Sequence, residues 1–312
     1  IPRSAGDIAF EGDDLGAMLA DPAIDVINVA LPNHLHFDAI MQCAEAGKHV
    51  ITEKPPAMSL AETDAMVEAC ASRGLKFGCT VQCRVRAAIQ AMRKAIADGR
   101  FGKLLHADAF MKWFRPVDYY HMDAWRSLRK SGAGVTVQHA FHYIDLLQYL
   151  VGPAARVQAR MTNLVHPDVA LEDTLLAFVD FECGAQGVVE ASTALWPGTD
   201  VRIEVNGTKG TAIMTGEKMA TWTFEDDQPE DEAIRRLGDE SQATAAGGAA
   251  DFGFADHQVV VEDFIEAVNT DRDVIIPVAS VRPTLEMVLA MYQSAAKGTS
   301  VDLPIIDDPS IW

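Results

Sequence analysis

The chain has 312 residues, 49% of them hydrophobic, so it can bury an extensive core, and its length suggests two domains. Its formal net charge of −19 disfavours nucleic acids and anionic membrane surfaces as partners, because like charges repel at long range. The five cysteines include no Cys-x-x-Cys pair and no apolar run approaches the ~20 residues that span a bilayer, which predicts reduced thiols in a cytoplasmic protein.

Strands and helices alternate along the first part of the chain. Residues 24–31 are a nearly continuous apolar run rich in β-branched side chains, which is typical of a buried parallel strand. Asn33 is expected to cap a helix over residues 34–46, and Gly47 to end it.

A second strand and helix follow at once. HVITE, residues 49–53, predicts a strand, and Ser59 with Glu62 has the spacing of a capping box for a helix that ends at Gly74. KFGCTV, residues 76–81, predicts a third strand. Short strands alternating with helices are the pattern of a parallel sheet.

The pattern changes after residue 82. A helix is expected over residues 84–97, and one further strong helix over 136–150. The other predicted elements are strands at 103–115, 155–165, 173–182, 186–195, 201–206 and 211–224. The sequence therefore predicts a Rossmann-type parallel α/β domain over residues 1–82, and over residues 83–312 an α+β domain with a largely antiparallel, open-faced sheet.

The last part of the second domain contains an acidic segment rich in Gly and Ala. We interpret residues 225–253 as a mobile, solvated excursion, followed by amphipathic helices at 256–269 and 281–297. The strands before this segment offer many outward Val, Ile and Ala positions. Because an apolar sheet face needs a cover, we expect a homo-oligomer, a dimer or tetramer, that packs through this sheet.

Two polar segments directly follow the first two predicted strands. LPNHLH at 31–36 and TEKPP at 52–56 fall at the strand ends where open parallel sheets bind ligands. Lys54, restricted by the following Pro55, could transfer a proton or polarise a substrate hydroxyl. The alternative is an ordinary lysine in an exposed loop.

Two histidines lie on the predicted helix near residue 140. His139 and His142 are three residues apart and would share one helix face, which favours an active-site wall over two buried core histidines. A metal site shared with His34 and His36 is disfavoured, because no cysteine or carboxylate completes a familiar ligand set. No metal is predicted.

The segment 112–130, KWFRPVDYYHMDAWRSLRK, is basic within an acidic chain. It carries five basic side chains against two acidic ones, interleaved with tryptophans and tyrosines. Aromatic faces stack on sugar rings, and arginine forks bind carboxylate or phosphate. We interpret the segment as one that recognises substrate; the alternative is a surface segment whose aromatic rings cover the sheet.

These segments, in this order, resemble the glucose-fructose oxidoreductase, inositol dehydrogenase and rhizopine-catabolism (Gfo/Idh/MocA) family. The resemblance spans nearly the whole chain and includes its last two helices. A Glu-Lys-Pro motif combined with a later His-x-x-Asp helix is its most specific part. The matching motifs are PNHLH, AGKHVITEKP, GRFGK, YYHMDAWR and GAGVTVQHAFHYIDLLQYLVG.

The resemblance implies an enzyme that transfers a hydride between NAD or NADP and a secondary alcohol of a sugar, polyol, sugar acid or nucleotide sugar. Lys54 would bind the reacting hydroxyl, and His142 would exchange its proton beside Gln138. The implied cofactor contacts are Leu31, Pro32, Asn33, His34, His36, Glu53, Lys54 and Gln82. The implied substrate contacts are Lys54, Arg84, Tyr120, Trp125, Arg126, His139 and His142.

The chain departs from the family pattern in two ways. Position 138, often Asp or Asn in the family, is Gln, which can hold a hydroxyl but cannot relay a proton. The family's G-x-G-x-x-G turn is missing, so we expect that the natural protein is longer and that this chain alone binds the dinucleotide poorly.

Two alternative functions stay open. One is a non-catalytic dinucleotide or sugar sensor, and the other is an NAD-dependent glycoside cleavage or elimination.

Overall fold

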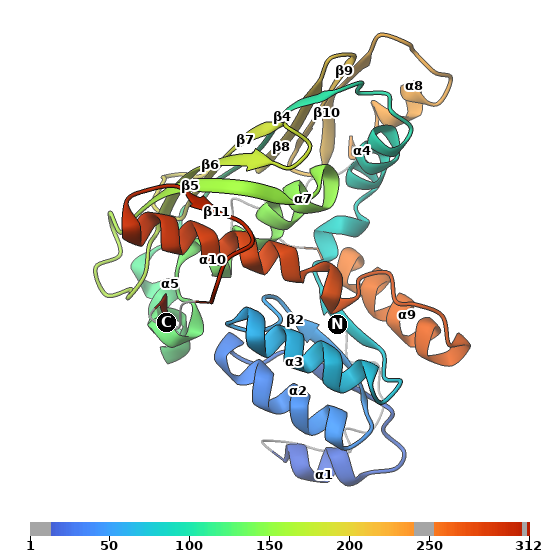
Figure 1. Ribbon diagram of the computed structural model, residues 1–312, viewed down its shortest axis with the longest axis vertical. Coiled ribbons are helices and arrows are strands. Elements are labelled where there is room, and N and C mark those ends of the chain that lie inside the picture. Colours follow the sequence, from blue (N-terminus) through green and yellow to red (C-terminus); the bar gives the residue numbers. More distant parts are fainter. Residues whose placement is uncertain (1–13, 240–252, 308–310) are drawn as a thin grey trace. The chain divides into compact units, whose positions relative to one another are not determined.

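The computed structural model describes residues 14–239, 253–307 and 311–312, which divide into two compact units (Figure 1). Unit 1 contains Ile1–Thr80 and Phe254–Arg282, and unit 2 contains Val81–Gly253 and Pro283–Trp312. The first boundary lies two residues before the expected one. The segment 254–282 falls in unit 1, whereas the sequence interpretation placed it in the second domain.

Unit 1 is built on a parallel sheet with the strand order β1-β2-β3. The strands are β1 (Val26–Val29), β2 (His49–Glu53) and β3 (Phe77–Thr80). The helices are α1 (Leu15–Ala20), α2 (His36–Glu45), α3 (Leu60–Ala71) and α9 (Ala255–Thr270). The predicted parallel α/β architecture is confirmed, because each apolar run supplies one buried strand and α9 packs against β2 and β3.

Local signals explain how two of these helices begin and end. The Ser59 side chain accepts a hydrogen bond from the Glu62 amide at 3.1 Å, and the Glu62 carboxylate accepts one from Met58 N, one residue before the amide that a capping box uses. Gly47 ends α2 with a positive φ of 72°. The prediction for Asn33 was wrong: it begins the 3₁₀ turn η1 (Asn33–Leu35), and α2 starts only at His36.

Unit 2 is built on an eight-stranded sheet with the strand order β10-β9-β8-β4-β7-β6-β5-β11. The strands are β4 (Leu104–Lys112), β5 (Ala154–Thr162), β6 (Thr174–Phe181), β7 (Gln186–Ser192), β8 (Arg202–Gly207), β9 (Gly210–Thr215), β10 (Lys218–Phe224) and β11 (Val301–Asp302). Only β4 and β7 pair in parallel, so the expectation of a largely antiparallel sheet is confirmed. The run predicted as one strand over 211–224 is instead a hairpin that turns at Gly216, φ 63°.

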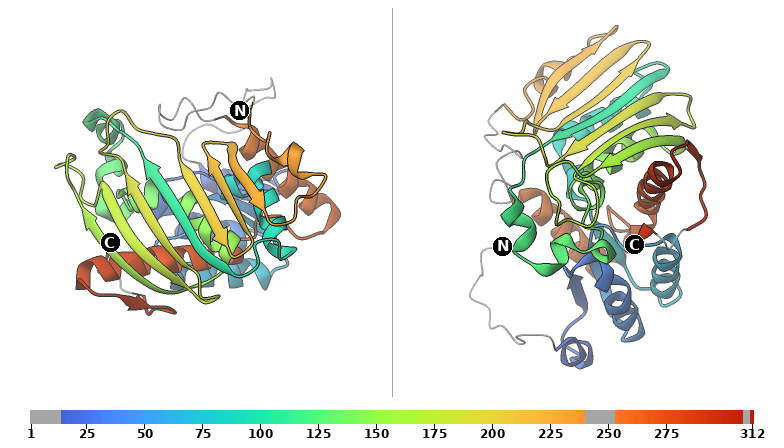
Figure 2. Two further views of the ribbon diagram at one scale, coloured as in Figure 1. Left: turned by 90° about the horizontal axis from the view of Figure 1, so that it is seen from above. Right: turned by 90° about the vertical axis from the view of Figure 1, so that its left-hand side faces the viewer.

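Helices of unit 2 cover one face of this sheet. They include α4 (Ala87–Ala97), α6 (Val135–Gln138), α7 (Phe141–Val151) and most of α10 (Arg282–Lys297). The opposite face is open: the strands lie in front of the helices in the left-hand view of Figure 2. On that face the Leu176 and Phe178 side chains of β6 are 48% and 69% exposed.

Part of the expected mobile excursion is tightly anchored. Helix α8 (Asp231–Ile234) buries Asp231, whose carboxylate accepts two hydrogen bonds from Arg100 at 2.7 Å and one from Trp222 Nε1 at 2.6 Å. The Arg100 guanidinium holds the pKa of Asp231 well below its usual range. The prediction therefore fails for residues 225–239, and residues 240–252 lie outside the described part of the chain.

None of the helices in the described part of the chain combines the length and apolar character needed to cross a bilayer.

Candidate active site

Two loops of unit 1 follow the carboxyl ends of β1 and β2 and are tied together by His36. This side chain is fully buried, with Nε2 2.8 Å from the Leu31 carbonyl and Nδ1 3.0 Å from the Pro55 carbonyl. Burial lowers the pKa of His36, although the hydrogen bonds to these two carbonyls oppose this effect. His36, predicted as a cofactor contact, thus has a clear structural role.

The residues that the sequence singled out lie in these loops. Lys54 directly follows β2, is partly buried, and precedes Pro55 through a cis peptide bond. Glu53 beside it is also partly buried, and Asn33, at the start of η1, is 8% exposed. Lys54 is therefore less exposed than an ordinary loop lysine.

A dinucleotide on this sheet edge would find partners for its nicotinamide riboside end. Asn33, Glu53 and Lys54 present polar groups there, directly after parallel strands. Gln82, two residues beyond β3, belongs to unit 2, and its buried Oε1 has no hydrogen-bond partner among the described residues. The residues present thus fit this part of the cofactor, while the sequence offers no G-x-G-x-x-G turn for the pyrophosphate.

The predicted helix that carries the two histidines is broken in unit 2. Helix α6 ends at Gln138, α7 begins at Phe141, and His139 lies between them with φ −124° and ψ −53°. The expectation that His139 and His142 share one helix face is therefore wrong. His139 is 7% exposed and packs edge-on against Trp113, ring centroids 6.0 Å apart, whereas His142 is partly exposed in the first turn of α7.

Helix α7 is anchored by an ion pair in the interior of unit 2. Arg84 Nε and Nη2 donate to the two Asp145 carboxylate oxygens at 2.7 and 2.6 Å, and Thr284 Oγ1 donates to Asp145 at 2.8 Å. Arg84 and Asp145 are 4% and 0% exposed. The structure thus pairs the Arg84 guanidinium with Asp145, and its contact with a substrate stays a prediction. Asp145 fixes the helix turn that follows His142.

The cation–aromatic segment, residues 113–126, holds Arg126 between two rings. The Arg126 guanidinium lies 4.8 Å from the Tyr119 ring centroid and 4.7 Å from that of Trp125. Its Nη1 donates to Tyr119 Oη and its Nε to Asp123, both at 2.9 Å, and the side chain is 22% exposed. Gln138 Nε2 donates to the Arg126 carbonyl at 3.3 Å, so these predicted residues are brought together.

Tyr120, predicted as a substrate contact, has different surroundings from its neighbour Tyr119. Tyr120 is 2% exposed, and its hydroxyl lies 2.8 Å from Thr193 Oγ1, so it belongs to the interior. Burial raises the pKa of Tyr120 well above its ordinary value. Tyr119, its neighbour, supplies the ring and hydroxyl beside Arg126. The sequence carried no signal to separate adjacent tyrosines, because only the orientation of the short helix α5 (Val117–His121) decides between them.

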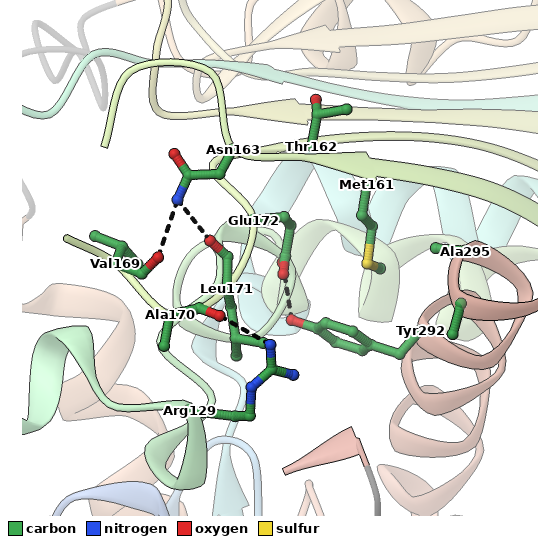
Figure 3. A pocket seen from close by; sticks show the side chains of 11 residues that line it. Arg129, Met161, Thr162, Asn163, Val169, Ala170, Leu171, Glu172, Tyr292 and Ala295 are labelled. Carbon is green, nitrogen blue, oxygen red and sulfur yellow. Dashed lines mark hydrogen bonds between the residues drawn. The ribbon is translucent and has the colours of Figure 1, made fainter. Parts of the chain in front are cut away.

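A cavity of about 340 Å³ lies elsewhere in unit 2, between the β5–β6 loop and α10 (Figure 3). Glu172 forms its buried side, accepting hydrogen bonds from Thr136 N at 3.0 Å and Tyr292 Oη at 2.8 Å. Burial raises the pKa of Glu172. Arg129 lines the cavity and donates to the Ala170 carbonyl. None of the residues predicted for catalysis, cofactor or substrate lines it.

No group of three or more His, Cys, Asp or Glu side chains that could hold a metal ion occurs within residues 14–239, 253–307 and 311–312.

Known proteins resemble both units. Residues 6–81 match the family model described as "Oxidoreductase family, NAD-binding Rossmann fold", and residues 89–213 match "GFO/IDH/MocA C-terminal domain". The levoglucosan dehydrogenase of Pseudarthrobacter phenanthrenivorans is 26% identical over 94% of this chain and 83% of its own length. The 1,5-anhydro-D-fructose reductase of Ensifer adhaerens is 32% identical, over 66% of this chain and 63% of its own length.

A solved structure gives the same result. The WlbA dehydrogenase from Bordetella pertussis, in complex with NADH and UDP-GlcNAcA, superposes with a TM-score of 0.83 at 29% identity. The match covers 94% of this chain and 82% of the WlbA chain. Since the two family models match consecutive parts of the sequence in the expected order, the chain belongs to the Gfo/Idh/MocA family of NAD-dependent oxidoreductases.

Proposed function

We propose that this oxidoreductase acts on a secondary alcohol of an anionic sugar derivative, a sugar acid or a nucleotide sugar, with NAD or NADP. The observation that carries the proposal is Arg126, held between two aromatic rings with part of its guanidinium exposed, in a chain of net charge −19. Rings of this kind suit a sugar, and the guanidinium suits its carboxylate or phosphate. The WlbA structure, which holds a sugar acid nucleotide, supports the same substrate class.

The chemistry divides between the cofactor and the side chains. When bound, the nicotinamide supplies the hydride acceptor, or the donor in the reverse direction. Lys54 donates a hydrogen bond to the reacting hydroxyl oxygen and stabilises the negative charge that develops on it. His142 takes the hydroxyl proton at a ring nitrogen and returns it in the reverse reaction. Gln138 is neutral, so it can hold a substrate hydroxyl by a hydrogen bond but cannot relay a proton.

Replacing Arg126 with alanine should separate anionic from neutral substrates. Loss of a charge-assisted hydrogen bond costs about 1.5–3 kcal/mol, so Arg126→Ala should raise KM for the anionic sugar by about 10- to 100-fold. A neutral analogue should change much less. Steady-state kinetics with both substrates measures the difference, and Arg236→Ala serves as the control because Arg236 is exposed and, among the described residues, pairs only with Glu232. Equal increases for both substrates would contradict the anionic class.

A non-catalytic sensor on the same fold is the second candidate. Gln138, where relatives often carry a carboxylate or an asparagine, favours it. Turnover above that of a Lys54→Ala control rules the sensor out, and saturable sugar binding without turnover supports it.

We also propose that the open sheet face of unit 2 pairs with a second copy of the chain. Leu176 and Phe178 are exposed near the middle of this sheet, and Phe178 lies beside Val188 in the register of β6 and β7. Such a face is stabilised when an identical sheet covers it. Light scattering after size exclusion should give a dimer or tetramer for the parent protein and a smaller species for Phe178→Glu. Thr223→Glu, on the edge strand β10, should leave the mass unchanged.

A further inference from the structure

A buried histidine–aspartate pair lies beside the cation–aromatic segment in unit 2. His166 and Asp173 side chains are both 1% exposed, and His166 Nδ1 lies 3.0 Å from Asp173 Oδ2. On the other side of the ring, Nε2 lies 2.7 Å from the Arg115 carbonyl. Neither residue belongs to the proposed chemistry, and burying such a pair is unfavourable unless every polar atom is satisfied.

The hydrogen bonds define the charge of the pair. A carbonyl only accepts, so the 2.7 Å contact with Arg115 requires a hydrogen on His166 Nε2. A neutral ring would then turn the lone pair of Nδ1 toward the carboxylate. Both nitrogens therefore carry hydrogens, provided that Asp173 is ionised.

Asp173 is held in its ionised form by other donors. Its oxygens accept hydrogen bonds from Leu164 N at 3.0 Å, Val165 N at 2.8 Å and Thr174 Oγ1 at 3.0 Å. Burial alone would raise the pKa of Asp173, but these amide donors and the His166 ring outweigh it and keep the pKa below its ordinary value. The pair is thus an imidazolium bonded to a carboxylate.

This pair joins the ends of the sheet strands to the cation–aromatic segment. Arg115, whose carbonyl it binds, is the last residue before Pro116, where the chain leaves the sheet for α5. The Tyr120 ring of α5 lies 4.7 Å from the His166 ring. The neighbouring residue, Tyr119, binds Arg126. A displaced His166 would therefore release the start of the segment that presents Arg126.

The β5–β6 loop that carries His166 is itself fixed. Asn163 Nδ2 donates to the carbonyls of His166, Val169 and Leu171 at 2.8, 3.0 and 2.9 Å, two of which are visible in Figure 3. Asn163 thus binds loop carbonyls from one end of the loop, and Asp173 binds loop amides from the other end. The loop contacts α5 through the rings of His166 and Tyr120.

We infer that His166 and Asp173 are positioning residues: their buried ion pair holds the cation–aromatic segment so that Arg126 meets the anionic group of the substrate. The inference rests on the proposed function only for the effect on binding of the anionic substrate. The protonation of the pair does not depend on that function. Among the described residues, Tyr120 packs its ring 4.7 Å from the His166 ring, and Arg115 contributes its carbonyl to His166 Nε2.

Two measurements need no substrate. Nitrogen NMR of histidine-labelled full-length protein at neutral pH should show one ring with hydrogens on both nitrogens, and this signal should vanish in His166→Gln but persist in His106→Gln, an exposed histidine of β4. Hydrogen exchange of residues 113–126 should be faster in His166→Gln and in Asp173→Asn. A singly protonated His166, or unchanged exchange in both variants, would overturn the inference.

Kinetics then tests the consequence for substrate. His166→Gln should raise KM for the anionic sugar about tenfold with kcat little changed, and this effect should disappear in an Arg126→Ala background, since both act through one group. A fall in kcat and a rise in KM for anionic and neutral sugars alike, additive with Arg126→Ala, would mean a merely structural pair. If Arg126→Ala itself fails to discriminate, the proposed function fails, and the NMR and exchange results still decide the inference.

Discussion

Lys54→Met is expected to lower kcat/KM by about 10²- to 10⁴-fold, the range in which a positioned acid–base or polarising group contributes to a reaction. The substitution keeps the length and apolar stem of the side chain and removes only the ammonium that we assign to the reacting hydroxyl. The reason is that negative charge develops on that oxygen as its proton leaves, and methionine cannot stabilise it. Initial rates over a range of substrate concentrations measure the loss.

Two comparisons decide whether the loss belongs to Lys54. Lys103→Met, at an exposed position before β4, removes the same charge and should leave the rate unchanged. His142→Asn should lower kcat by a comparable factor, because it removes the group that exchanges the proton. A Lys54→Met protein with nearly parental turnover would refute the assignment.

Asp145→Asn is expected to be the most damaging single substitution for stability among the ion pairs of unit 2. It leaves the Arg84 guanidinium buried without its bidentate carboxylate, because asparagine keeps one oxygen acceptor and replaces the other with an NH2 donor. Breaking a buried pair from one side costs about 3–5 kcal/mol, since the remaining charge stays out of water. Urea unfolding of the parent and the variant measures the free energy of unfolding directly.

The matched control is an exposed ion pair. Lys94 and Asp98 are joined on the surface of α4, where their side chains are 72% and 44% exposed. Asp98→Asn should leave the urea midpoint unchanged, because solvent screens such pairs. If Asp145→Asn unfolds at the same urea concentration as Asp98→Asn, the ion pair does not anchor α7.

The sequence predicted those parts of the fold whose signals are local. The runs at 24–31, 49–53 and 76–81 each contain a parallel strand, and Ser59 caps the following helix as the sequence implied. Strand and cap signals lie within a few residues of the structure they specify. They therefore need no knowledge of distant partners.

Long-range contacts decided the features that the sequence missed. Asp231 lies in a segment without periodicity, and it is ordered because Arg100, 131 residues earlier in the chain, meets its carboxylate. The break at His139 lies inside a strongly helical pattern. It coincides with packing of the His139 ring against Trp113 from another segment, which a helix pattern cannot reveal.

The site was predicted in part for the same reason. Arg126 and Gln138, both predicted as site residues, are joined by a hydrogen bond in the structure. Arg84 and Tyr120 were assigned to substrate, but burial and partners far along the chain place both in the interior. A basic or aromatic residue in a recognised motif indicates the neighbourhood of a site. Which member faces the ligand depends on tertiary packing.

The most direct test of this account is cofactor reduction by the purified protein. The enzyme is incubated with NAD or NADP and with matched pairs of sugars that differ only in carrying a carboxylate or a neutral group at one position. The account predicts that reduced nicotinamide forms with the sugar acids at a kcat/KM at least about tenfold above that of their neutral partners. Preference for the neutral sugars, or no reduction with any sugar or nucleotide sugar while the parent fold is intact, would contradict it.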